Sequence, residues 1–312
     1  MAEPALPKVT VGVCTYRRPE LLRLTLESLM QQTLPASDFE VVVVDNDTER
    51  SAQALVESLT SRPHGPTLRY FVEPGRGVSH VRNQCVAQAR GDWLAFIDDD
   101  EEARPDWLSQ LLSAQQRYSA DVVLGPVNPL LPDDAPSWLR ALGRSTDKPD
   151  MATGTPVPPG YGGAGNALIR RSLVLARGAA PFQPALSLTG GEDTELFNWL
   201  RQGGAVLVWC GEAWADEHQP ASRLRLRHYL YRSLQFATVY WRGEYAQWGR
   251  LRALAHAVAG AVIGLACLVL GGVAYPLQPS SGVPLMMTGM RGMARILALL
   301  RVQVAGYGHG HD

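Results

Sequence analysis

The sequence has few cysteines, no excess of charge and no apolar leader. Its four cysteines show no paired spacing, which argues against a disulfide framework or a zinc site and favours buried thiols in a reducing compartment. The formal net charge is −1 over 312 residues, so no global field attracts nucleic acid, and we expect no nucleic-acid partner. Residues 1–8 lack the apolar segment of a signal peptide, so we expect the catalytic part to stay in the cytosol.

Apolar strand patterns alternate with helical patterns through the first 124 residues. Strands are predicted over 9–14, 39–44, 68–71, 93–97 and 120–124, and helices over 19–31, 52–59, 78–89 and 106–118. This order predicts an α/β fold with a mostly parallel sheet flanked by helices. Ligands of such sheets bind outside the carboxyl ends of the strands. We therefore expect the polar residues that follow three of these strands, at 14–15, 45–46 and 98–100, to meet on one rim.

The run Asp98, Asp99 and Asp100 directly follows the apolar stretch 93–97. Three adjacent carboxylates repel one another, so at least one should resist ionising unless a cation lies nearby. A divalent metal that carries phosphates is the leading candidate for that cation. The simpler alternative is that these acids cap the next helix, but a cap needs only one or two acids and five stand here.

The last third of the chain differs in kind. Seven arginines and one acid, Glu244, lie between residues 223 and 252, and 23 uncharged residues follow up to Pro276. That run is long enough to span a bilayer, whereas 285–304 carries three arginines and favours an interfacial helix. A spanning helix, a re-entrant segment and an apolar helix docked on the globular part remain open. Residues 126–162, rich in Pro, Gly and Asp, predict an ordered insertion or a mobile loop beside the site.

These shifts predict three regions: a catalytic domain over 1–222, a basic juxtamembrane helical region over 223–252, and a membrane-associated tail over 253–312. Arginines on the amino side of the apolar run fit the positive-inside rule. We therefore expect the chain at the cytoplasmic face of the cell (inner) membrane, anchored by its C-terminal tail.

Five motifs in order carry a family resemblance. They are the segment from Thr15 to Arg18 after the first strand, Asp45 and Asn46 after the second, Arg82 and Asn83, the acid run at 98–100, and Glu192 and Asp193 after two glycines. Over residues 8–240 this pattern resembles the family 2 inverting glycosyltransferases of the GT-A fold. The resemblance implies a Rossmann-like GT-A domain that uses a nucleotide-sugar and a divalent metal, Mg²⁺ or Mn²⁺.

The resemblance also implies residue roles on the donor side. Thr15, Tyr16 and Arg17 surround the base and ribose, and Asp45 accepts a hydrogen bond from the base, typically uracil. Arg82 holds the nucleotide or Asp98, and Asp98 itself lies on the ribose side. Asp100 binds the metal, which stabilises the leaving nucleoside diphosphate. Further predicted contacts are Asp99, which has no firm role, Asn166 to the sugar, and His218 to the metal or the diphosphate.

Glu192 and Asp193 stand at the start of a predicted helix over 192–202. An inverting transfer needs one base that deprotonates the acceptor hydroxyl as it attacks the anomeric carbon. The resemblance assigns this base to Asp193 and leaves Glu192 to bind the acceptor or the donor sugar. An acid at a helix start also serves as a simple cap.

Together these features predict a metal-dependent inverting glycosyltransferase. It would move a sugar, from a UDP-sugar by resemblance, to a hydroxyl of a lipid-linked or growing saccharide in cell-surface polysaccharide or glycolipid synthesis. Two alternatives remain. A nucleotidyltransferase that makes a nucleotide-sugar usually carries a glycine-rich basic signature near the amino terminus, where this chain has Cys-Thr-Tyr-Arg-Arg. A non-catalytic nucleotide-sugar-binding membrane scaffold would not need the intact acids.

Overall fold

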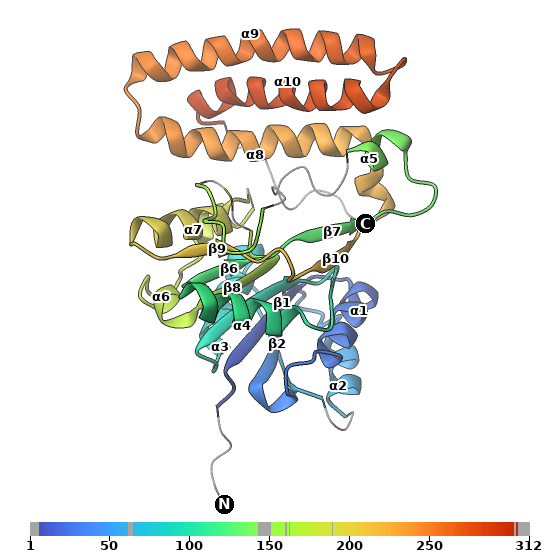
Figure 1. The fold of residues 1–312 in the computed structure, drawn as a ribbon, viewed down its shortest axis with the longest axis vertical. Coiled ribbons are helices and arrows are strands. Elements are labelled where there is room, and N and C mark those ends of the chain that lie inside the picture. Colours follow the sequence, from blue (N-terminus) through green and yellow to red (C-terminus); the bar gives the residue numbers. More distant parts are fainter. Residues whose placement is uncertain are drawn as a thin grey trace, which may run out of the picture. The chain divides into compact units, whose positions relative to one another are not determined.

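The computed structural model describes residues 6–61, 65–142, 151–159, 161, 163–188, 190–302 and 304 (Figure 1). The predicted insertion at 126–162 therefore falls partly outside the described residues. The chain divides into two compact units. The first comprises the described residues of Met1–Leu130, Asp147–Leu188 and Glu192–His218, and the second those of Leu131–Thr146, Thr189–Gly191 and Gln219–Asp312.

The first unit is built on a seven-stranded sheet in the order β3-β2-β1-β4-β8-β6-β9. All neighbouring pairs are parallel except those of β8, which runs antiparallel to both β4 and β6. The mixed α/β GT-A-like fold with a mostly parallel sheet is thus confirmed. The strands are β1 (Val9–Thr15), β2 (Phe39–Asp45), β3 (Thr67–Val72), β4 (Trp93–Asp98), β6 (Val122–Leu124), β8 (Asn166–Arg170) and β9 (Leu207–Trp209).

Helices cover both faces of this sheet, which explains why its central strands are mostly apolar and buried. All seven residues of β2 are buried, since alternate valines belong to opposite cores. One face packs against α1 (Pro19–Met30), α2 (Gln53–Thr60) and α4 (Trp107–Tyr118). The other packs against α3 (Val78–Gln88), α6 (Arg171–Leu175) and α7 (Glu192–Gln202). This double burial fixes the strand ends, and therefore the site, in a rigid frame.

A second, three-stranded sheet has the order β5-β10-β7. Its strands are β5 (Glu101–Ala103), β7 (Val127–Leu130) and β10 (Ala215–His218), with β10 antiparallel to β5 and parallel to β7. The sequence pattern did not predict this sheet, because each strand is three or four residues long and β5 and β10 consist mostly of charged residues. Each of the three strands closely follows a strand of the main sheet along the chain.

The second unit is helical. It contains α5 (Ser137–Ala141), α8 (Leu226–Ala246), α9 (Arg250–Ala274) and α10 (Pro279–Leu299), with α10 lying between α8 and α9 (Figure 1). α9 and α10 approach closely through glycines. A Cβ added at Gly264 would lie 2.8 Å from the carbonyl oxygen of Gly289, and one at Gly271 would lie 2.8 Å from that of Gly282. Among the described residues, α9 is the single helix long and apolar enough to cross a membrane.

Candidate active site

The carboxyl ends of β1, β2 and β4 form one rim of the main sheet. Thr15 pairs in register with Asp45, and Cys14 pairs with Asp98. The expectation that the polar residues after these strands meet on one rim is confirmed, because the three strands are parallel neighbours.

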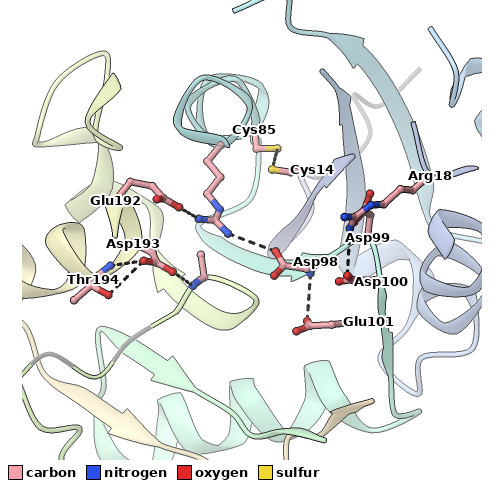
Figure 2. A network of polar contacts seen from close by, with 12 residues as sticks. Cys14, Arg18, Cys85, Asp98, Asp99, Asp100, Glu101, Glu192, Asp193 and Thr194 are labelled. Carbon is pink, nitrogen blue, oxygen red and sulfur yellow. Dashed lines mark hydrogen bonds and ion pairs between the residues drawn. The ribbon is translucent and has the colours of Figure 1, made fainter. Parts of the chain in front are cut away.

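The acid run lies in the short connection from β4 to β5 (Figure 2). The Asp98 side chain is 45% exposed, whereas Asp99 and Asp100 are buried. Thr15 Oγ1 donates to Asp99 Oδ2 at 2.8 Å, and Arg18 Nη1 lies 3.2 Å from Asp100 Oδ2. Burial, and then repulsion from Asp100, raise the pKa of Asp99 to about 7 although Arg18 and Thr15 oppose the shift. One carboxyl group of the run therefore resists ionising, as expected for adjacent acids.

Arg82 joins the acid run to the start of α7. Its guanidinium is buried and contacts Glu192 Oε1 through Nη1, while Nη2 lies 3.4 Å from Asp98 Oδ1 (Figure 2). Burial lowers the pKa of Arg82, but the two carboxylates outweigh it and raise that pKa above its ordinary value. A planar guanidinium suits this bridge because it donates in two directions at once. In the present arrangement Arg82 therefore links two acidic motifs.

Glu192 and Asp193 differ sharply in environment. Glu192 is 1% exposed, and burial followed by repulsion from Asp193 raises its pKa to about 7 against the pull of Arg82. Asp193 is half-buried, and its carboxylate accepts hydrogen bonds from the backbone N–H groups of Ala164 at 3.2 Å and Thr194 at 2.6 Å (Figure 2). The accessible, oriented carboxylate of this pair is that of Asp193.

Two predicted contacts are buried and hydrogen-bonded inside the protein. Asp45 is fully buried and accepts from the N–H groups of Asp47 and Ala52 and from the Tyr70 hydroxyl, at 2.8–3.0 Å. Asn166 is also fully buried; it accepts from the Trp107 indole N–H and donates to two backbone carbonyls, at 2.7–2.8 Å. Both side chains are therefore fixed by contacts within the first unit.

The loop after β1 is more open. The Tyr16 side chain is exposed, and the Arg17 guanidinium lies 5.2 Å from its ring centroid. Arg17 adopts a φ of 54° and pairs with Asp47 at 3.2 Å. Both side chains are accessible to a ligand at the rim.

Arg18 was not predicted as a site residue, yet it contacts both Asp99 and Asp100. The sequence signal was weak because adjacent arginines in a loop are usually solvated. The positive φ at Arg17 marks a local turn in the backbone, and such a turn is not encoded in any residue pattern.

His218 lies on β10, where its N–H donates to the carbonyl of Asp100 at 2.8 Å. Its ring contacts Glu102 rather than the acid run. Among the described residues no group of three or more His, Cys, Asp or Glu side chains has the arrangement of a protein-only metal site. The structure therefore brings the backbone of His218 to the acid run, but directs its ring to β5.

The acid run still fits a metal that is shared with a substrate. Mg²⁺ commonly binds through one or two carboxylates plus phosphate oxygens and needs no protein cage. The half-exposed Asp98 and the raised pKa of Asp99 both indicate room for added positive charge. Asp98 presents the more open carboxylate, because the side chain of Asp100 is 5% exposed and paired with Arg18.

The arrangement of strands and acids is that of a GT-A-type transferase domain. Comparison with known protein families and sequences leads to the same class. The family model described as Glycosyl transferase family 2 matches residues 10–175. The succinoglycan biosynthesis protein ExoM of Rhizobium meliloti (strain 1021) is 40% identical over 220 residues, which cover 70% of this chain and 69% of ExoM. ExoO of the same organism is 30% identical over 128 residues, covering 40% of this chain and 35% of ExoO. The chain belongs to glycosyl transferase family 2 and is a glycosyltransferase.

Solved structures share the fold at lower identity. Staphylococcus aureus TarS superposes with a TM-score of 0.51 at 18% identity, over 75% of this chain and 42% of TarS. Its fragment 1-349 in complex with UDP gives a TM-score of 0.51 at 18% identity, over 91% of this chain and 89% of the fragment. At this identity the likeness concerns the fold alone.

Proposed function

We propose that this glycosyltransferase inverts the anomeric centre as it moves a sugar from a UDP-sugar to a hydroxyl of a lipid-linked or growing saccharide during polysaccharide synthesis. The UDP complex of TarS supports the choice of a UDP donor, and the similarity to the succinoglycan biosynthesis protein ExoM supports the pathway. Catalysis is assigned to residues 1–222, membrane association to the basic region 223–252 and the tail 253–312, and the working location to the cytoplasmic face of the membrane.

The observation that carries the proposal is the division of roles between Glu192 and Asp193. Two backbone N–H groups orient the accessible carboxylate of Asp193, so it suits a base that must meet an acceptor hydroxyl. Glu192 is buried against Arg82. Its role is to orient its neighbours, and it does not take the proton of the acceptor hydroxyl. Asp193 would take the hydroxyl proton as the acceptor oxygen attacks the anomeric carbon and the diphosphate leaves from the opposite face.

The leaving group belongs at the acid run. Asp98 and Asp100 would hold Mg²⁺ or Mn²⁺, which when bound neutralises the charge that develops on the leaving diphosphate. Arg18 pairs with both Asp99 and Asp100 and holds them together. Arg82 pairs with Asp98 and links it to the start of α7. The exposed Tyr16 and Arg17 stand where the nucleotide would lie.

The test is a donor screen that measures released nucleoside diphosphate, with and without Mn²⁺ and a saccharide acceptor. Asp193→Asn keeps the shape but removes the base, and we expect turnover to fall by about 10³-fold with little change in donor KM. Glu195→Gln is the matched control, because it removes a charge two residues further along α7 at a pair with Arg177. Full turnover in Asp193→Asn would reject the base assignment, and no diphosphate from any donor would reject the function.

A further inference from the structure

The three long helices of the second unit differ in where their charged residues lie. α8 carries Arg227, Arg232, Arg242 and Glu244, and α10 carries Arg291 and Arg295. α9 has Arg250 and Arg252 in its first turn and no Asp, Glu, Lys or Arg in its remaining 22 residues. α8 and α10 thus carry arginines within their length, whereas α9, which α10 separates from α8, has none beyond its first turn (Figure 1).

α9 has two distinct sides. Its buried side is a narrow stripe of small residues that packs against α10: Ala253, Ala257, Gly260, Gly264 and Gly271. The opposite side consists of large apolar residues in the open. Leu251, Val262 and Val273 are 85%, 65% and 66% exposed. At about 100° per residue, their 11-residue spacing places these three within roughly 20° of one line, opposite the stripe.

α8 lies alongside α10 and contacts it at both ends. The two helices must therefore tilt together relative to a membrane. Leu226 and Leu230 at the start of α8 share an apolar cluster with Val283 near the start of α10. At the other end, the guanidinium of Arg295 lies 4.9 Å from the Trp241 ring centroid. α9 is tied to the same frame by its glycine contacts with α10.

We propose that α9 lies within one leaflet of the membrane, with its axis parallel to the bilayer plane, and does not cross it. If α9 stood across the bilayer, the parallel α8 would stand with it and carry Arg232, the seventh of its 21 residues, into the hydrocarbon, where charge is strongly disfavoured. With the layer lying flat, α9 enters the leaflet and α8 stays about 16–20 Å away at the headgroups, given 8–10 Å between neighbouring helix axes.

The charged and aromatic residues of this unit indicate that the exposed face of α9 contacts an anionic membrane leaflet. Residues 219–302 contain ten arginines, no lysine and one acid. At the α8–α9 end, Trp241, Tyr245 and Trp248 surround His256, and Arg252 lies 4.1 Å from the Trp248 ring centroid. Tryptophan, tyrosine and arginine are the residues that anchor helices at a membrane interface.

The proposal rests on the membrane association included in the proposed function, and depth measurements separate the two. Cysteines introduced one at a time at Leu251→Cys, Val262→Cys and Val273→Cys, each in a full-length Cys267→Ala background, carry a fluorophore whose depth is measured with lipid-borne quenchers. The same background without an introduced cysteine measures labelling at Cys14, Cys85 and Cys210. The vesicles contain phosphatidylcholine and phosphatidylglycerol. Ser222→Cys, at an exposed site before α8, is the aqueous control.

An in-plane helix gives three equal depths. A crossing helix places Val262 deeper than both ends by about 16 Å, because 11 residues rise about 1.5 Å each, and this result would overturn the proposal. Quenching of all three sites by aqueous iodide would overturn membrane insertion itself. Shielding of the three sites without lipid, with a dimeric mass, would assign the face to a second copy instead. Diphosphate release, measured on the same samples, reports separately whether the proposed transfer function holds.

Discussion

Asp99 makes the catalytic unit sensitive to pH, and Asp99→Asn should remove part of that sensitivity. Its carboxyl group is 7% exposed, and burial raises its pKa from 3.8 to about 7. Between pH 4 and pH 7 the folded chain therefore holds a proton that the unfolded chain has lost. Over that range the free energy of unfolding falls as pH rises, and it levels off above pH 7.

The size of this loss of stability follows from the pKa shift of Asp99. About three pKa units at roughly 1.4 kcal/mol each correspond to about 4 kcal/mol of stability lost by pH 8. Asparagine cannot ionise, but it keeps only part of the hydrogen bonding with Thr15 and Arg18, which costs about 1–2 kcal/mol. We expect a net gain of about 2 kcal/mol at pH 8. For a unit of this size that corresponds to a rise of roughly 4–8 °C in Tm.

Thermal unfolding of the wild type and Asp99→Asn, followed from pH 4 to pH 8, checks this reasoning. Near pH 4, where both side chains are uncharged, Asp99→Asn should melt below the wild type because of its weaker hydrogen bonds. The two curves should cross as pH rises, and the variant should melt at the higher temperature at pH 8. Asp98→Asn is the control, because that side chain is 45% exposed and neutralising it relieves little burial. A Tm that falls with pH as steeply in Asp99→Asn as in the wild type would refute the assignment of the proton to Asp99.

Three further changes test the frame around the site. Arg82→Lys should lower kcat by about 10²-fold with a smaller change in donor KM, since lysine lacks the second nitrogen with which the guanidinium reaches Asp98 while it holds Glu192. Arg177→Lys, at another pair with α7, should not. Asn166→Ala should lower the free energy of urea unfolding by about 3 kcal/mol, because it leaves the Trp107 N–H unpaired; a pure KM effect would instead favour sugar contact. Gly12→Ala should cost about 1–3 kcal/mol, because the new methyl lies 2.9 Å from a core aromatic ring, and an unchanged Tm would contradict this.

The parallel part of the fold could be predicted because its signals are local. A buried strand such as β2 is a run of valines, and helices such as α1 carry leucines at helical spacing. Once the strands are known to be parallel, their carboxyl ends must share a rim, although the register of Thr15 with Asp45 and of Cys14 with Asp98 is visible only in the structure. The family 2 resemblance rested on residues at these ends and on two helical motifs, Arg82 with Asn83 and Glu192 with Asp193.

The partners of each side chain could not be predicted in the same way. Arg82 meets Glu192 across 110 residues of sequence, and Arg18 meets Asp100 across 82, so only the folded chain brings them together. The antiparallel direction of β8 and the whole second sheet were also missed. Strands of three or four residues with charged side chains owe their form to neighbouring strands and not to an apolar pattern of their own.

The acid run also connects the two sheets of the first unit. Asp99 and Asp100 are the two residues between β4 of the main sheet and β5 of the small one, and the carbonyl of Asp100 receives the N–H of His218 from β10. The small sheet is thus attached to the large one through a connection whose charges repel. Neutralising those charges should stabilise this connection. We therefore expect binding of a donor at the site and ordering of the small sheet to favour each other.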